Sequence, residues 1–165
     1  MVERVLRLAQ LWQVPAVYVC ENNHYAESTP ASQQLPIADL AKRAVAYGMH
    51  SITVDGQDVE EVLRAAGRAL EHARSGKGPV FLLCETYRLV GHYVGDPQVY
   101  RPKEELKELR ETQDPLDHLL AKLDLSDEDR EDIEREVEEL VEASVEFAKA
   151  GTDPKPEDAL LNVYA

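Results

Sequence analysis

The run at residues 79–84 is apolar at every position, and this lack of alternation constrains the fold most strongly. A strand that is apolar on both faces is typical of the middle of a parallel sheet with helices on either side. Two further runs, at residues 16–20 and 51–54, are also short and strand-like, and the first is expected to be a buried strand. Because helical patterns separate the three runs, we predict an α/β fold with a parallel sheet and flanking helices.

Segments with helical spacing of apolar residues lie between the strand-like runs. The first helix is expected over residues 2–12, and the second from Pro36, at its first turn, to Gly48. Asp58 and Glu61 have the spacing of a capping box at the start of the third helix. The third helix is expected to bury an apolar stripe that consists of Val59, Val62, Leu63, Ala66 and Leu70.

The composition becomes strongly acidic towards the C-terminus. Residues 103–150 hold 18 acidic and 7 basic residues, which is most simply the solvated face of helices. Ser126 is the expected N-cap of a long helix, with Asp129 three residues further on. The apolar stripe of this helix contains Ile133, Val137, Leu140, Val141, Ser144 and Ala148. We predict two domains: a parallel α/β part over residues 1–101, and a helical region over residues 102–165 that packs on the sheet or on a partner subunit.

The charge and hydropathy of the chain exclude several classes of partner. A net charge of −14 argues against nucleic acid, because phosphate binding needs clustered Lys and Arg. No apolar run approaches the roughly 20 residues that span a membrane, and the first residues lack the apolar core of a signal peptide. We therefore expect a cytoplasmic protein. Cys20 and Cys84 lie inside apolar runs, which favours buried small side chains over a metal or redox site.

A polar cluster at residues 21–25 follows the first strand-like run. Ligands of an open parallel sheet bind beyond the carboxyl ends of its strands, so this cluster lies where a site is expected. The amide oxygens of Asn22 and Asn23 suit a hard cation such as Mg2+, which keeps few protein ligands. The same residues are also ordinary turn residues, because Asn tolerates a left-handed backbone. Both interpretations stay open on these residues alone.

A second candidate site is the loop at residues 86–101. Gly91, Gly95 and Pro97 prevent a regular helix there, and the loop carries His, Arg, Tyr and Asp side chains. Loops of this composition are often kept for binding or catalysis. A single histidine such as His92 is, without further context, more often a surface residue.

The sequence resembles the C-terminal part of the α subunit of the thiamine diphosphate-dependent first component of 2-oxoacid (pyruvate-type) and acetoin dehydrogenase complexes. The strand that ends in Asn22 and Asn23 and the loop around His92 carry the strongest likeness. Shorter matching stretches are residues 38–48, 54–56, 113–116 and 158–165. The resemblance implies the thiamine diphosphate-binding fold, of which this sequence would form the second half.

The resemblance also implies roles for single residues. Asn22, Asn23, Tyr25 and His92 would bind thiamine diphosphate. The side chain of Asn23 and the backbone carbonyl of Tyr25 would be ligands of Mg2+. His92, whose counterpart lies over the cofactor in that family, would be catalytic.

Other residues of the loop indicate the branch of the family. Tyr87 and Arg88 would support the active-site loop. Tyr93 stands where the animal pyruvate enzymes have a regulatory serine, so the sequence does not support phosphorylation at this position. The stretches at residues 25–27 and 91–98 look closer to the acetoin branch.

The resemblance implies an oxidoreductase that acts on acetoin or on a 2-oxo acid such as pyruvate and passes the acyl unit to a lipoyl group. Such α subunits work in a heterotetramer with a β subunit, together with a lipoyl-bearing acyltransferase component. This sequence has no Gly-Asp-Gly segment to supply a further Mg2+ ligand, so we expect an upstream half to carry it and the chain alone to be inactive. The alternatives are a non-catalytic remnant or assembly module, and another thiamine enzyme of the transketolase type.

Overall fold

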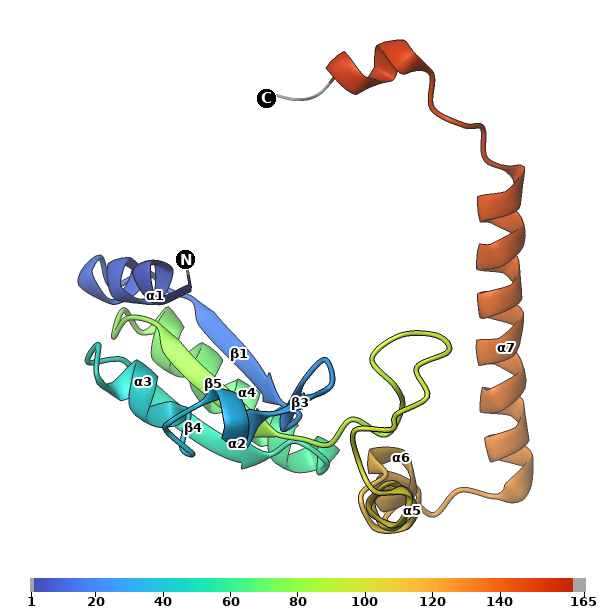
Figure 1. The fold of residues 1–165 in the computed structure, drawn as a ribbon, viewed down its shortest axis with the longest axis horizontal. Helices are drawn as coiled ribbons and strands as arrows, with labels where there is room; N and C mark the ends of the chain where they lie inside the picture. The colour runs from blue at the N-terminus through green and yellow to red at the C-terminus, as the bar shows by residue number, and fades with distance from the viewer. Residues whose placement is uncertain (1, 162–165) are drawn as a thin grey trace. The chain divides into compact units, whose positions relative to one another are not determined.

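The computed structural model describes residues 2–161 and contains the parallel sheet that the apolar runs predict (Figure 1). Its three strands lie in the order β1 (Val17–Asn22), β5 (Val80–Glu85) and β4 (His50–Asp55). Both outer strands run parallel to β5, and most side chains of β5 are buried. The predicted α/β fold class is therefore confirmed.

The register of the strands brings their carboxyl ends to one edge of the sheet. Asn22 on β1 pairs with Glu85 on β5, and Glu85 pairs with Asp55 on β4. Each strand thus ends in a polar residue at the same level. The polar cluster after β1 and the loop after β5 both begin at this edge, so the fold places the starts of the two candidate sites next to each other.

Helices cover both faces of the sheet (Figure 1). On one face α4 (Val59–Arg74) packs against β4 and β5. The buried core on this face consists of Val54, Ala65, Leu82 and Cys84. The opposite face is covered by α1 (Val2–Leu11) and α3 (Ala41–Val45). Its buried residues are Leu6, Ala44 and Met49, with Tyr18, Tyr47 and Phe81 packed against them. The two cores explain why β5, which contributes to both, needs an unbroken apolar sequence.

The buried stripe of α4 differs in part from the predicted one. Val62 and Ala66 pack against the core as expected. The fully buried positions of the helix, however, are Ala65, Ala69 and Ala73. The exposed members of the predicted stripe are Val59, Leu63 and Leu70, of which Leu63 is 72% exposed. The prediction chose the larger apolar side chains, and it was wrong because small side chains at the contact let a helix lie closer to its neighbours.

The single helix predicted from Pro36 to Gly48 is shorter and starts later. One separate turn of helix, α2 (Ala31–Gln34), precedes Pro36, and α3 begins only at Ala41. The side chain of Asp39 accepts a hydrogen bond from the backbone N–H of Ala41 (3.0 Å), which starts the helix after Pro36 rather than at it. The helix also ends earlier than predicted, at Val45. Gly48 closes the turn that follows, with a φ of 75°, a left-handed conformation that favours glycine.

β1 is longer than the apolar run predicts, and it is not fully buried. The strand continues through Glu21 to Asn22, so the first asparagine lies in the sheet rather than after it. Val19 is 58% exposed. Among the described residues, β5 is the one strand that pairs with β1. The expectation of a buried strand was therefore wrong for this chain, because α4 packs mainly on β4 and β5 and leaves the edge strand β1 partly uncovered.

The chain forms two compact units, which are described separately. The first extends to Leu123 and also contains α5 (Lys103–Thr112) and α6 (Pro115–Leu120). The second begins at Asp124 and contains α7 (Asp127–Ala150) and a short 3-10 helix, η1 (Pro156–Leu160). The domain boundary predicted after residue 101 stays a prediction. Residues 158–165 resemble the C-terminus of the family's α subunits, and residues 162–165 of this stretch lie outside the described part of the chain.

The structure tests both of the predicted helix caps. The capping box of Ser126 and Asp129 at the start of α7 is confirmed. At the start of α4, the carboxylate of Asp58 accepts hydrogen bonds from the backbone N–H groups of Glu60 and Glu61 (both 3.0 Å). Asp58 is thus the expected N-cap. The second bond of a capping box, from the Asp58 backbone N–H to the Glu61 side chain, is absent from the described part of the chain.

No helix between residues 2 and 161 has both the length and the apolarity needed to cross a membrane.

Asp58 also joins α4 to the end of the first unit, and this gives stability that depends on pH. Its Oδ2 lies 2.8 Å from Lys122 Nζ. The hydrogen bond from Lys122, followed by those from the backbone, lowers the pKa of Asp58 from 3.8 to about 2. A carboxylate with a lowered pKa stabilises the folded chain fully above the unfolded value, and this stabilisation is lost as the pH falls towards the folded value.

Asp58→Asn is expected to flatten the acid response of the first unit. Asparagine keeps an oxygen that can cap α4 but loses the charge that pairs with Lys122. Between about pH 5 and pH 2 the melting temperature of the wild type should therefore fall more steeply than that of the variant. Thermal melts followed by circular dichroism measure this difference. Parallel curves for the two proteins would show that the ion pair has no role in stability.

Candidate functional site

The carboxyl edge of the sheet brings Asn22, His24 and Glu85 together. Asn22 Nδ2 donates a hydrogen bond to Glu85 Oε2 (2.8 Å), and His24 Nε2 lies 3.4 Å from the same oxygen. Asn22 and Glu85 are register partners at the ends of β1 and β5, so strand pairing itself places them together. The backbone N–H of Thr86 donates to the carbonyl of Asn22 (2.9 Å) and extends the pairing by one residue. Glu85 thus orients the amide of Asn22.

The backbone turns sharply at His24, directly after β1. His24 has a φ of 64°, which is uncommon for a residue other than glycine. The side-chain oxygen of Asn23 accepts a hydrogen bond from the backbone N–H of Tyr25 (3.0 Å), and that of Asn22 accepts one from His24 (3.4 Å). Such bonds to a residue one or two positions ahead are typical of asparagine in turns. The Asn-Asn pair therefore shapes a turn, and it puts the Asn23 oxygen next to the backbone of Tyr25.

A short antiparallel hairpin follows this turn, formed by β2 (Tyr25–Ala26) and β3 (Thr29–Pro30). Tyr25 faces Pro30 across the hairpin. The two residues are a non-hydrogen-bonded pair of the hairpin, so the carbonyl of Tyr25 points away from Pro30. The neighbouring N–H of Ala31 donates to the carbonyl of His24 instead (2.7 Å). The Tyr25 carbonyl is therefore not used by its partner residue in the hairpin.

The ring of Tyr25 anchors the turn to other parts of the first unit. The guanidinium carbons of Arg88 and Arg101 lie 5.7 Å and 5.6 Å from the ring centroid, within the range of cation–π interaction. The Tyr25 hydroxyl donates to Glu105 Oε1 on α5 (3.1 Å). Burial, together with this hydrogen bond, raises the pKa of Tyr25. The turn is thus attached to the loop at residues 86–101 and to α5.

Asp96 organises the loop at residues 86–101. Its carboxylate accepts hydrogen bonds from the backbone N–H groups of His92 (2.8 Å) and Gln98 (2.9 Å), and from the hydroxyl of Tyr100 (2.7 Å). These bonds, of which the one from Tyr100 has the largest effect, hold the pKa of Asp96 below its ordinary value. The loop is irregular, as its glycines and proline predict, and its own polar contacts hold it.

Arg101 fixes the loop from inside, and it is only 5% exposed. Its guanidinium donates to the carbonyls of Arg88 (2.7 Å) and Val90 (3.1 Å), and its Nε donates to the side chain of Gln98 (3.2 Å). Arg88 in turn donates to the carbonyl of Glu27 in the hairpin turn (2.7 Å). The two arginines therefore hold the loop together and tie it to the hairpin after β1.

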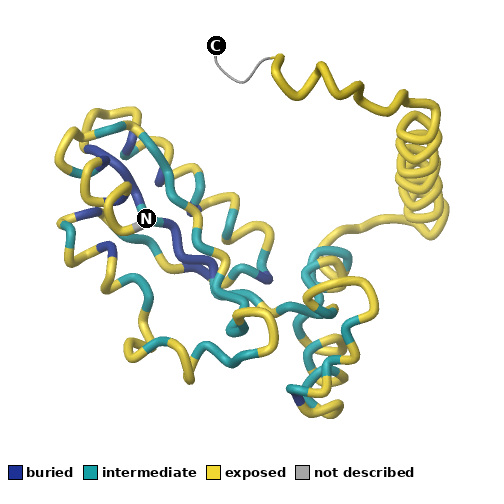
Figure 2. The backbone as a smooth tube through the Cα atoms, turned by 45° about the horizontal axis from the view of Figure 1, so that its top comes forward, coloured by how far each residue is buried: buried dark blue, intermediate teal, exposed yellow. Residues whose placement is uncertain are grey.

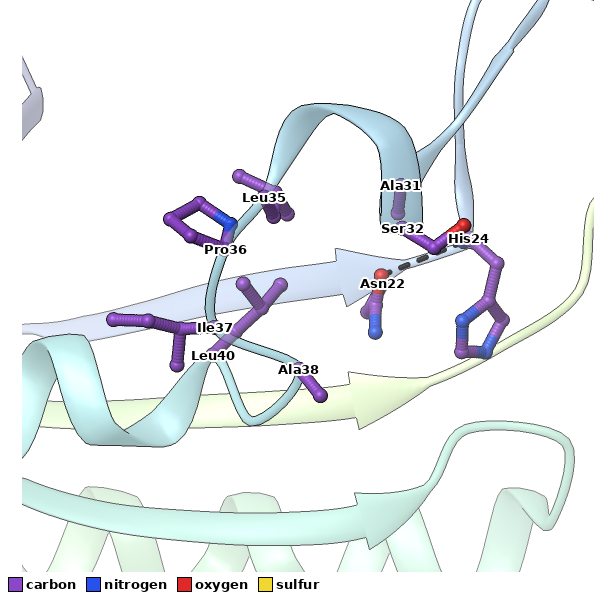
Figure 3. A pocket seen from close by; sticks show the side chains of 9 residues that line it. All are labelled: Asn22, His24, Ala31, Ser32, Leu35, Pro36, Ile37, Ala38 and Leu40. Atoms are coloured by element: carbon purple, nitrogen blue, oxygen red, sulfur yellow. Dashed lines mark hydrogen bonds between the residues drawn. The ribbon is translucent and has the colours of Figure 1, made fainter.

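A cavity of 410 Å³ adjoins Asn22 and His24 (Figure 3). Its other lining residues, which come from α2 and the segment after it, are Ala31, Ser32, Leu35, Pro36, Ile37, Ala38 and Leu40. The walls are mostly apolar, and the polar side chains gather at the end near the sheet edge. Cavities with an apolar lining and a few placed polar groups are the usual form of small-molecule sites.

The sequence-predicted site residues fall into two groups. The structure brings Asn22, Asn23 and Tyr25 together at the turn after β1. His92 lies on the loop, where its side chain is exposed and packs edge-on against the ring of Tyr93 (6.5 Å between centroids). Within the described chain, no hydrogen bond joins the His92 side chain to the turn.

Sequence reasoning missed four residues that shape the site. Asp96 had a usable signal, because Asp followed by Pro is a common start of a turn. His24 and Glu85 lie in polar clusters directly after strand-like runs, where a site is expected, but this position does not identify their roles. Arg101 had no signal. The roles of the three residues depend on partners far along the chain or on a backbone conformation. The Asn22–Glu85 contact, for example, spans 63 residues.

A parallel sheet with polar residues at its carboxyl edge and an adjoining cavity defines the class of ligand-binding α/β domains. Within that class, residues 2–157 match the family described as "Dehydrogenase E1 component". This match covers most of the chain, so the chain belongs to the dehydrogenase E1 component family.

Curated relatives of the chain carry two kinds of name. It is 40% identical over 163 residues to the α subunit of acetoin:2,6-dichlorophenolindophenol oxidoreductase of Bacillus subtilis (strain 168), covering 96% of this chain and 48% of that protein. The protein of the same name from Cupriavidus necator is 39% identical over 163 residues, covering 96% of this chain and 49% of that protein. Pyruvate dehydrogenase E1 component subunit alpha of Rhizobium meliloti (strain 1021) is 38% identical over 154 residues, with 91% and 44% covered. The chain thus spans about half the length of the curated relatives it matches.

Proposed function

We propose that the chain forms the magnesium-side half of a thiamine diphosphate site in the α subunit of a dehydrogenase E1 component. The substrate would be acetoin or a 2-oxo acid such as pyruvate, and the acyl unit would pass to a lipoyl group. Family membership and the names of the relatives support this assignment. The partners would be a β subunit, a segment that carries Gly-Asp-Gly, and a lipoyl-bearing acyltransferase component.

The observation that carries the proposal is the pair of oxygens at the turn after β1. Asn23 Oδ1 accepts one hydrogen bond from the backbone of Tyr25, and an amide oxygen has a second lone pair for a metal ion. Tyr25 and Pro30 form a non-hydrogen-bonded pair of the hairpin, so the carbonyl of Tyr25 is not used across the hairpin. Two neutral oxygens suit Mg2+, which takes its other ligands from carboxylate, water and phosphate. These residues therefore fit one side of a magnesium site.

A carboxylate ligand would have to come from outside this turn. No group of three or more His, Cys, Asp or Glu side chains placed to hold a metal occurs between residues 2 and 161. We propose that the Gly-Asp-Gly segment supplies the acidic ligand. Asn22 would bind the cofactor from the sheet edge, where Glu85 fixes the orientation of its amide.

Thiamine diphosphate supplies a nucleophilic carbon and an electron sink for cleaving the bond next to a carbonyl. Within this chain, His92 would contact the reacting group and move protons there. Asp96 would be a positioning residue, because its carboxylate holds the backbone N–H of His92 (2.8 Å). Tyr87 and Arg88 would support the loop, and Arg88 ties it to the hairpin after β1.

The second candidate function is a non-catalytic remnant or assembly module that keeps subunit-packing surfaces without binding cofactor. The exposed apolar side chains of α7 favour it, because large exposed apolar surfaces mark sites of association. The two functions differ in cofactor binding, which an assembly module lacks.

Isothermal titration of thiamine diphosphate and Mg2+ separates the two functions. The titrations use this chain alone and this chain mixed with a separately expressed first half of an α subunit. We expect binding in the mixture only. Asn23→Ala is expected to weaken this binding by at least about 10-fold, the smaller end of the effect of disturbing metal-site residues.

Gln33→Ala is the matched control, because it removes an exposed amide of α2 that does not line the cavity. It should leave binding of thiamine diphosphate unchanged. If the mixture associates but releases no heat with cofactor and Mg2+, the assembly module becomes the better account. If Asn23→Ala and the wild type bind thiamine diphosphate and Mg2+ equally well, the Asn23 side chain is not a metal ligand.

A further inference from the structure

α7 carries an apolar seam along one side of the helix. Its members recur at alternate steps of four and three residues, the spacing of helices that pack on other helices. The seam consists of Ile133, Val137, Leu140, Ser144 and Phe147. Val141 and Val145 widen it in the second half of the helix. Every apolar member is at least 46% exposed, and all of α7 is exposed (Figure 2).

Contacts within α7 do not account for its stability. Isolated helices are marginal in water, and most helices in proteins are stabilised by packing of an apolar face. The capping box at Ser126 and three exposed ion pairs between near neighbours in the helix are individually weak. The seam is therefore expected to pack against another surface.

The charges of α7 indicate what kind of surface this is. The helix holds 11 acidic and 3 basic residues. Each basic residue is already paired with an acidic one within the helix; the pairs are Arg130–Glu134, Arg135–Asp132 and Lys149–Glu146. Helical periodicity places Glu138 along one side of the seam, and Glu136 and Glu139 along the other. These three carboxylates have no ion-pair partner among residues 2–161.

A second copy of α7 is a poor occupant of the seam, because it would bring two rows of carboxylates together. The rest of the chain offers no excess of positive charge either. Residues 1–123 contain 17 acidic and 14 basic residues, and residues 124–165 contain 15 acidic and 4 basic residues. Charge complementarity therefore favours a basic partner from another chain.

We propose that α7 is a docking surface for a cationic amphipathic helix of another protein, with apolar residues facing the seam and Lys or Arg beside them. This inference does not depend on cofactor binding. Two synthetic helical peptides test it, both as long as α7 (24 residues) and with Leu at the seam positions. One has Lys at the flanking positions, and its twin has Glu there.

Fluorescence anisotropy with labelled peptides and the full chain should show that the Lys peptide binds and that the Glu peptide binds at least about 10-fold more weakly. Leu140→Glu places a charge in the seam and should abolish binding. The double variant Glu136→Lys, Glu139→Lys should weaken binding of the Lys peptide by about 10-fold. Glu128→Lys makes the same kind of charge change on the side of the helix away from the seam, and binding should be unaffected. Circular dichroism checks that the variants keep their helix content.

Several outcomes would overturn the proposal. Equal binding of the two peptides would show that charge does not select the partner. A dimer in sedimentation that Leu140→Glu dissociates would assign the seam to a second copy. If Leu140→Glu lowers the melting temperature of the first unit, the first unit of the same chain covers the seam.

Discussion

Replacing Arg101 with methionine is expected to release the loop at residues 86–101 while the sheet stays folded. Methionine keeps much of the volume of the side chain but has none of its hydrogen-bond donors. The carbonyls of Arg88 and Val90 and the side chain of Gln98 would lose their donor. Each buried polar group without a partner costs about 1–3 kcal/mol. Because the loop has few apolar contacts of its own, local opening is the cheapest response.

Hydrogen exchange and limited proteolysis measure this release directly, as faster exchange and cleavage within the loop of Arg101→Met. In an assembled, active enzyme, turnover should fall by roughly 100-fold, since misplacing a catalytic group by about 1 Å has effects of that size. Loop protection and turnover of Arg101→Lys should lie between those of the wild type and those of Arg101→Met. One ammonium group can donate some of the hydrogen bonds but cannot replace the planar fork of donors. Arg64→Met, at an exposed position of α4, is the matched control and should leave the loop protected. Unchanged protection in Arg101→Met would mean that this arginine does not anchor the loop.

Gly56→Ala is expected to destabilise the first unit by about 1–3 kcal/mol or more. A Cβ at this position would clash with Thr86 Cγ2 and would lie 2.8 Å from the carbonyl oxygen of Glu85. The backbone N–H of Gly56 donates to that same carbonyl (2.7 Å), so the two backbones cannot separate without losing this bond. The clash lies beside Glu85, which means that the orientation of Asn22 should change as well.

Chemical denaturation measures the loss as a lower midpoint with an unchanged slope. Gly67→Ala is a sharp control, because a Cβ there meets no atom within 4 Å, and alanine favours a helix over glycine by up to about 1 kcal/mol. The two substitutions are thus expected to act in opposite directions. Adding Thr86→Ser to Gly56→Ala removes the methyl group and should restore part of the stability. Gly56→Ala with wild-type stability would contradict the close packing.

The sequence predicted those parts of the fold that follow from local pattern. The unbroken apolar run of β5 and the capping box at Ser126 both appear as expected. The buried face of α4 was not predictable from periodicity, because the space between helix and sheet selected Ala65 and its neighbours over larger side chains. The exposure of β1 depends on which strands pair beside it, and this information is not local.

The candidate site shows the same division. The position of Asn22 and Asn23 follows from a general rule about the carboxyl ends of parallel strands. The same rule places Glu85 at this edge, because it follows the run at residues 79–84. The contact of Glu85 with Asn22 and the contacts of Arg101 could not be predicted, because they join residues that approach each other only after folding. The role of His92 stays a prediction that rests on the resemblance, and the structure adds that Asp96 holds its backbone.

The strand order has a consequence for synthesis on the ribosome. β5 is the last of the three strands to be made, yet it lies in the middle of the sheet and pairs with both of the others. Among residues 2–161, β1 and β4 therefore have no partner in this sheet until residues 80–85 have been made. Pairing of strands distant in sequence is slow, and unpaired edges promote aggregation. The nascent chain is thus expected to depend on chaperones until β5 emerges, and a product that ends before residue 80 should be unable to form the sheet.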